Sequence, residues 1–127
     1  MAYDNLVHCN SFNATAALPD TSNFIFVKLD PANAGNVVVC TAGALAAGVI
    51  QEGTPSGAGD PVPVCTPGSV TKLLVSQTVT PGQFVSSDAN GNGVPATSGA
   101  SYLGQVIQGA TAGFLAVILF QPAGTTP

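Results

Sequence analysis

One stretch of this chain has the residue types and the spacing of a metal-binding loop. Residues 88–93 (DANGNG) carry oxygen-bearing side chains at positions one, three and five and glycine at position six, as an EF-hand calcium loop does. That loop also needs a glutamate at its twelfth position, where this chain has Gly99, and no helical pattern flanks it. Aspartate, asparagine and glycine are equally the residues of tight turns. The sequence therefore favours a β-turn and predicts no metal site.

The other reactive residues do not form a catalytic constellation. His8 is the sole histidine and stands beside Cys9, but a Cys–His pair needs a rigid scaffold and a third group that orients the base. Lys72 invites comparison with lysines that carry lipoyl or biotinyl groups at hairpin tips, yet it falls inside a strand pattern. The six acidic residues are scattered singly, mostly beside turn-forming residues. We expect no catalytic residue, no cofactor and no enzymatic activity.

The composition points toward assembly. Of the 127 residues, 46% are hydrophobic and only 6% are charged, against about 25% charged residues in an average protein. Eight charges cannot supply the charged surface that keeps a monomer soluble, so we expect other subunits to cover much of it. The net charge of −4, with two lysines and no arginine, argues against nucleic acid and against anionic membranes.

Cysteine usage and the N-terminus suggest a reducing compartment. Three cysteines, at positions 9, 40 and 65, are an odd number without CxxC spacing, which does not indicate a disulfide framework. The first ten residues lack the basic start and apolar stretch of a secretory signal. The longest apolar run, residues 114–120, is much shorter than the roughly 18 residues that a transmembrane helix requires.

The chain contains one pattern twice. Residues 47–68 and 103–124 each begin with glycine near a Val-Ile-Gln triplet, continue through a glycine-rich interruption and end in an apolar run with a Pro/Gly turn. A solenoid needs at least three repeats, so two matching hairpins within one β-domain fit better. The alternative is that the two segments are similar by chance, because Gly, Val and Ala are common in this chain.

The remaining pattern predicts an all-β protein, a single compact domain resembling a barrel or sandwich. Short runs rich in β-branched and aromatic residues alternate with Gly, Pro, Asn and Asp turns, which is typical of eight to ten short strands. The clearest alternation is at 70–76, where Thr71, Leu73 and Val75 share one face. Prolines at 61 and 63 predict that the strand at 61–66 is an edge strand. The run 114–120 lacks alternation, so both of its faces should be covered. The expected strands are 24–29, 37–41, 61–66, 70–76, 83–86, 94–97, 102–108 and 114–121.

Residues 1–23 show few strand signals and are predicted to form an extended N-terminal arm ahead of the β-domain, residues 24–127. Such an arm can add as a strand to the sheet edge of a neighbouring molecule. The arm is therefore a candidate segment for binding another protein.

The segment from Gly48 to Phe120 resembles the capsid decoration, or cement, proteins of tailed bacteriophages. The resemblance is carried by three phrases in order: Gly48-Val49-Ile50-Gln51-Glu52 with Ala58-Gly59-Asp60-Pro61-Val62-Pro63-Val64; Gly82-Gln83-Phe84-Val85-Ser86-Ser87-Asp88-Ala89-Asn90-Gly91-Asn92-Gly93-Val94-Pro95-Ala96; and Leu103-Gly104 with Ala110, Gly113, Val117 and Leu119. Residues 1–46 match no phrase of that family, and the charge content is lower than the family's.

The resemblance implies a β-barrel-like homotrimer on the outer capsid surface that clamps neighbouring major capsid subunits, made in the host cytoplasm before assembly. The candidate capsid contacts are Leu6, Val7, Phe12 and Leu18. The candidate trimer-interface residues are Val62, Val64, Phe114, Leu115, Val117 and Leu119. Two alternatives remain open: a phage fibre or tail domain that binds host glycan, which needs clustered aromatics and carboxylates, and an enzyme of unknown type.

Overall fold

The computed structural model describes residues 9–14, 23–51, 59, 61–122 and 125–126, and the elements in these ranges are all strands. The ten strands are β1 (Cys9–Ala14), β2 (Phe26–Leu29), β3 (Asn36–Val39), β4 (Gly48–Ile50), β5 (Pro61–Cys65), β6 (Ser69–Leu74), β7 (Phe84–Ser87), β8 (Gly93–Pro95), β9 (Gly104–Gln108) and β10 (Leu115–Phe120). The predicted all-β class is confirmed. Within the described ranges there is no helix long and apolar enough to cross a membrane.

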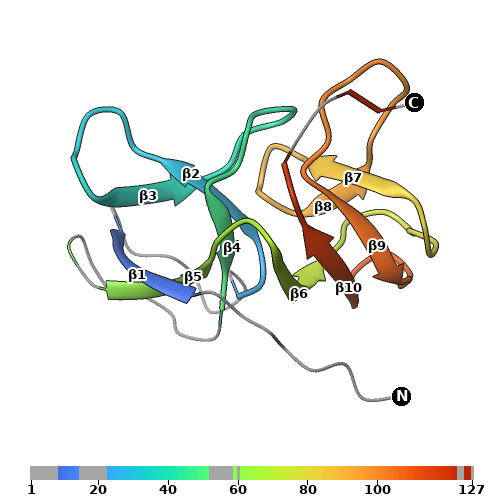
Figure 1. The fold of residues 1–127 in the computed structure, drawn as a ribbon, viewed down its shortest axis with the longest axis horizontal. Coiled ribbons are helices and arrows are strands. Elements are labelled where there is room, and N and C mark those ends of the chain that lie inside the picture. Colours follow the sequence, from blue (N-terminus) through green and yellow to red (C-terminus); the bar gives the residue numbers. More distant parts are fainter. Residues whose placement is uncertain (1–8, 15–22, 52–58, 60, 123–124, 127) are drawn as a thin grey trace.

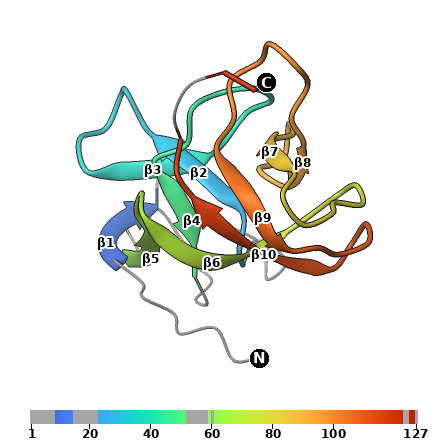
Figure 2. The same cartoon turned by 45° about the vertical axis from the view of Figure 1, so that its right-hand side comes forward.

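The strands divide into two lobes (Figure 1). Strands β1 to β5 form a closed barrel in the order β1-β3-β2-β4-β5, and β6 to β10 form a sheet in the order β6-β10-β9-β7-β8. The turned view shows β10 between β6 and β9 (Figure 2). Because β5 leads into β6 through only three residues, the chain passes from the barrel to the sheet by one short crossing.

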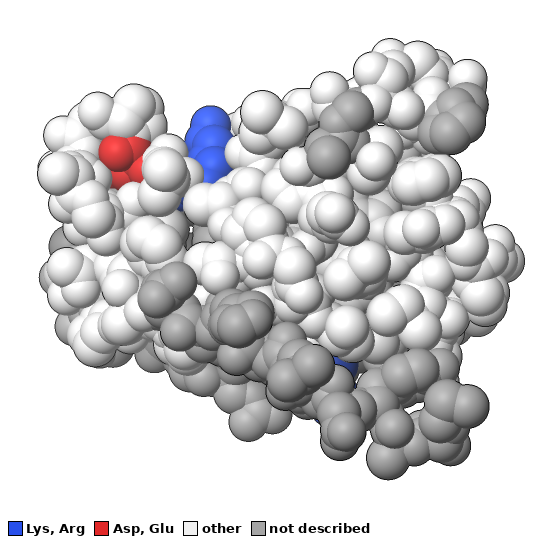
Figure 3. Space-filling model, in the orientation of Figure 1, with Lys and Arg blue, Asp and Glu red and all other residues white. Residues whose placement is uncertain are grey.

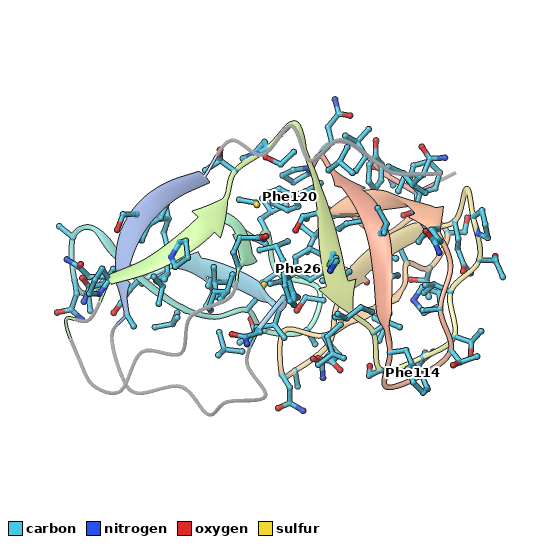
Figure 4. The ribbon with its side chains drawn as sticks, turned by 90° about the horizontal axis from the view of Figure 1, so that it is seen from below. Phe26, Phe114 and Phe120 are labelled. Carbon is cyan, nitrogen blue, oxygen red and sulfur yellow. The ribbon has the colours of Figure 1, made fainter. Side chains whose placement is uncertain are left out.

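One apolar core joins the two lobes. Phe26 of the barrel meets Phe120 of the sheet with ring centroids 6.0 Å apart, and the two rings lie between the lobes in Figure 4. Val49 from β4 and Leu73 from β6 belong to the same buried cluster. A second cluster fills the barrel interior; its buried members are Ala14, Val27, Val37, Ile50, Val62 and Val64. The shared core makes the lobes parts of a single compact domain.

Backbone hydrogen bonds also cross between the lobes. The Phe26 amide donates to the Gly91 carbonyl (2.7 Å), and the Leu74 amide donates to the Phe24 carbonyl (2.8 Å). Gly91 has a φ of +80°, and a Cβ there would lie 2.6 Å from the Phe26 carbonyl oxygen. Glycine is therefore required where the β7–β8 turn approaches β2.

The two copies of the repeated pattern both form antiparallel hairpins. The first copy gives β4–β5 in the barrel and the second gives β9–β10 in the sheet. A Cβ on Gly48 would lie 2.2 Å from the Cys65 carbonyl oxygen, and one on Gly104 would lie 2.5 Å from that of Leu119. Each copy thus begins with a glycine that lets its hairpin strands approach closely.

Two sequence predictions about the barrel were wrong. Residues 9–14, expected to belong to a strand-poor arm, form β1, which pairs antiparallel with β5 and parallel with β3. Strand β5, expected at an edge because of its prolines, pairs with both β1 and β4. Its register with β4 involves only Val64 and Cys65, beyond both prolines, and the Pro63 carbonyl still accepts a hydrogen bond from the Gln51 amide (2.9 Å).

Candidate interaction surface

The outer face of the sheet is apolar, as the inner face is. Alternation along β6 and β10 sends Leu73 and Ile118 inward, where both are completely buried, and sends their neighbours outward. Cross-strand pairing places Leu74 opposite Leu115 and Val70 opposite Leu119 on the outside. A sheet with one solvated face normally carries polar residues there. The apolar outer face is therefore suited to contact with another surface.

This outer face continues across β9 to β7. Gln105 of β9 is paired with Leu119 on one side and with Phe84 on the other. The Phe84 ring packs against Tyr102 with centroids 4.5 Å apart. We define the outer sheet face by its outward residues, which are mostly apolar: Val70, Lys72, Leu74, Phe84, Ser86, Gln105, Ile107, Gln108, Leu115, Val117 and Leu119. Lys72 is the one charged residue of this set.

The Lys72 side chain lies over the aromatic ring of Phe24. Its ammonium nitrogen lies 5.8 Å from the centroid of Phe24, within cation–π range. Phe24 has a φ of +60°, a region that bulky residues rarely adopt. Two backbone hydrogen bonds hold it there, from its amide to the Ile50 carbonyl and from the Leu74 amide to its own carbonyl, each 2.8 Å. These hydrogen bonds fix the backbone of Phe24, whose ring is the partner of the Lys72 ammonium.

Phe114 precedes β10 at the tip of the β9–β10 hairpin, away from the core (Figure 4). Its side chain is 66% exposed and that of the next residue, Leu115, is 43% exposed. Large aromatic side chains gain most of their contribution to binding from burial in a partner's surface. The tip and the outer face therefore extend one apolar surface. The view in Figure 3 likewise shows few charged side chains.

The structure separates the predicted trimer-interface residues into two groups. Phe114, Leu115, Val117 and Leu119 lie together on or beside the outer sheet face. Val62 and Val64 do not, because both are completely buried inside the barrel. Their prediction for an interface is corrected, because both side chains belong to the chain's own barrel core.

The predicted capsid contacts lie mostly outside the described residues. Leu6, Val7 and Leu18 fall there. Phe12 lies in β1 opposite Val62 and packs, half-buried, against the barrel cluster. Phe12 thus already contributes to this chain's own fold.

Sequence reasoning did not assign Phe24, Val70, Leu74 or Phe84 to the surface. The signal for two of them was present, because the alternation at 70–76 put Val70 and Leu74 on the face opposite the core. Phe84 joins the outer sheet face through its pairing with Gln105. Phe24 lies beside the face as the ring partner of Lys72, in a left-handed backbone conformation.

The DANGNG segment is a turn between β7 and β8, as predicted. One Asp88 carboxylate oxygen accepts hydrogen bonds from the amides of Asn90 (2.8 Å) and Asn92 (2.9 Å). The other oxygen accepts one from the Ser76 hydroxyl (2.8 Å). The described residues include no group of three or more His, Cys, Asp or Glu side chains placed to hold a metal ion.

Cys40 is a core residue, as predicted. Its side chain is buried in the shared core, and its Sγ is 3.6 Å from the carbonyl oxygens of Thr41 and Ala44. Burial raises the pKa of the Cys40 thiol, while a hydrogen bond with Ser87 opposes that shift. A protonated, buried thiol is a poor nucleophile.

A solved structure has a fold similar to that of this chain. The chain is similar in fold to the head fiber gp8.5 N base of bacteriophage phi29. The match has a TM-score of 0.72 and covers 94% of this chain and 99% of that one, at 10% sequence identity. No protein-family model and no curated protein sequence matches the chain.

Proposed function

We propose that this protein is a structural component of a bacteriophage particle, which sits on the outer surface of the capsid as a homotrimer and clamps neighbouring major capsid subunits. The observation that carries the proposal is the apolar outer sheet face, because such a face is suited to burial against another protein. The fold itself is similar to that of a phage head fiber base. The described residues gather no metal-ligand cluster, Asp88 holds its own turn and Cys40 is packed in the core, so the proposed role is structural and not enzymatic.

The outer sheet face is the proposed contact between copies of the chain. The outer sheet face has one cation and no carboxylate, so it offers little to steer a charged partner. Three copies of such a mostly apolar face can be buried around a threefold axis, with each Lys72 ammonium near the Phe24 ring of its own chain. Obligate homo-oligomer interfaces are apolar in this way. The exposed ring of Phe114 at the rim supplies an anchor for the neighbouring copy.

Light scattering after size exclusion tests the assembly. The wild-type chain should have about three times the 12.5 kDa chain mass. Leu119→Glu places a charge in the middle of the outer face, opposite Val70 and Gln105 and not opposite Lys72, and should dissociate the trimer. The variant chain should still fold, because Leu119 is an outward residue that is only partly buried in the single chain.

Ala34→Glu is the matched control, because it adds the same charge at an exposed position of the β2–β3 connection in the barrel, outside the outer sheet face and the β9–β10 tip. It should leave the trimer intact. A wild-type monomer at micromolar concentration, or equal masses for both variants, would contradict the proposed interface.

Attachment is tested with particles stripped of the protein. Re-added wild-type chain and Ala34→Glu should sediment with the particles, and Leu119→Glu should not, because single contacts on a capsid are weak without the multivalency of a trimer. Failure of the trimeric wild-type chain to sediment would contradict the capsid role while leaving the trimer standing.

The similarity to a head fiber base favours one second candidate, a fibre-type domain that binds host glycan. Glycan sites combine aromatic rings with carboxylates. Phe84 and Tyr102 form an aromatic pair, but the described acids Asp30 and Asp88 each hydrogen-bond the backbone of their own turn. Glycan binding that is lost in Tyr102→Ala and kept in Asp30→Asn would support this candidate.

A further inference from the structure

The barrel brings two cysteines that are distant in the sequence directly opposite each other. Strands β1 and β5 are antiparallel, and their register pairs the Cα atom of Cys9 with that of Cys65. The sequence alone placed the three cysteines in no relation to one another, because β1 was not recognised as a strand. Cys40 is not a third member, since it lies in the shared core with its Sγ near the Thr41 and Ala44 carbonyls.

Directly opposed residues of an antiparallel pair have the spacing that a disulfide needs. Their Cα atoms are about 4.5 Å apart at non-hydrogen-bonded positions and about 5.5 Å apart at hydrogen-bonded positions. Disulfides span Cα separations of about 4.4–6.8 Å, with the cysteines on one face. The Cα separations typical of directly opposed residues thus fall within the range that disulfides span.

The position of Cys65 on β5 defines that face. Val62 and Val64 alternate into the barrel interior, so Cys65, next in the strand, belongs to the opposite face. It is paired with Cys9 on one side and with Val49 on the other. Val49 belongs to the core shared with the sheet, and Cys65 is itself completely buried. A bond formed here would be shielded from solvent reductants.

We propose that Cys9 and Cys65 are a site of oxidative modification that forms an intrachain disulfide with a low-molecular-weight disulfide as oxidant. The thiolate of one cysteine attacks a sulfur of the small disulfide, a mixed disulfide forms, and one small thiol leaves. The second cysteine, as thiolate, attacks its partner's sulfur in the mixed disulfide, and the second small thiol leaves. The two protein thiols are oxidised by two electrons, and the small disulfide is reduced to two thiols.

The bond would fasten the strand that closes the barrel. β1 completes the circle between β5 and β3, but its register with β3 comprises only two residue pairs, Asn13–Asn36 and Ala14–Val37. Access of the oxidant to the completely buried Cys65 requires local opening of the barrel, a kind of motion that folded proteins undergo without unfolding globally. Once formed, the disulfide makes barrel closure covalent. The inference concerns the chain itself and stands whether or not the capsid role is correct.

The test is peptide mapping of the full chain, reduced and then incubated with glutathione disulfide. After unreacted thiols are alkylated under denaturing conditions, the oxidised wild-type chain should carry one label, on Cys40, and yield one linked peptide containing Cys9 and Cys65. Reduction should restore three labels. The thermal midpoint should be higher for the oxidised chain than for the reduced chain by about 5 °C or more.

Two variants make the result specific. Cys40→Ala should still yield the linked peptide and the thermal shift. Cys9→Ser, which leaves the buried Cys65 in place, should yield neither. Three labels on the oxidised wild-type chain, a linkage through Cys40, or a bond between two copies of the chain would each overturn the proposal.

Discussion

Asp88 organises its turn with the carboxylate oxygens that calcium would otherwise need. Asp88→Ala removes the acceptor of the Asn90 and Asn92 amides and of the Ser76 hydroxyl, and should lower the free energy of unfolding by about 1–2 kcal/mol. Asp88→Asn keeps the acceptor for the two amides and should lose less. Urea denaturation measures both. Neither EDTA nor calcium should move the wild-type midpoint, and a stabilisation of several degrees by calcium would show that the turn is a metal site.

Cys40 should make stability depend on pH in the alkaline range. Burial raises its pKa in the folded chain, so above the ordinary thiol pKa of about 8.5 the folded state holds a proton that the unfolded state has released. The free energy of unfolding contributed by this group is complete below that pH and is lost as the pH rises toward the folded-state pKa. Between about pH 8 and pH 10 the wild-type chain should lose more stability than Cys40→Ala. Parallel losses in the two proteins would contradict this assignment.

At the scale of elements, the β4–β5 hairpin depends on the absence of one Cβ. Gly48→Ala would place a methyl group 2.2 Å from the Cys65 carbonyl oxygen, so the strands must separate. We expect a loss of about 3 kcal/mol in the free energy of unfolding. Gly35→Ala is the comparison, because a Cβ on Gly35 would have no atom within 4 Å. Its φ of +77° is the only source of strain, so this substitution should cost about 1 kcal/mol. Equal losses in a urea titration would show that close strand approach is not the constraint.

Most elements could be predicted because their residues carry the period of a strand. The alternation of Thr71, Leu73 and Val75 marked the inner face of the sheet, and all three are buried. Strand β1 could not be predicted in this way. Its sequence, CNSFNA, has one aromatic and no β-branched residue, so its extended form depends on the two partners that barrel closure supplies.

The candidate surface was only partly predictable for a related reason. An apolar run such as 114–120 predicts that both faces of a strand are covered, and three of the predicted trimer-interface residues, Leu115, Val117 and Leu119, lie on the outer sheet face. Val62 and Val64 alternate with prolines and lie in the barrel interior, since periodicity reports burial but not the partner that provides it.

For the whole molecule, the segment ahead of β1 is the proposed capsid-binding part. Deleting residues 2–8 removes Leu6 and Val7 and leaves β1 in the barrel, whereas a longer deletion would remove a barrel strand. The shortened chain should remain a folded trimer and should no longer sediment with stripped particles, because three such segments on one trimer supply the avidity. Retained attachment at full occupancy would place the capsid contact on the β-domain.

A cryo-EM map of the particle from which the protein is purified tests the central claim most directly. The account predicts density on the outer capsid surface with local threefold symmetry, at points where capsid subunits meet. The barrel and sheet should fit that density with the outer sheet face, around Val117 and Leu119, turned toward the threefold axis. Density for this fold only on the tail, or outer sheet faces that are open to solvent in the assembled particle, would contradict it.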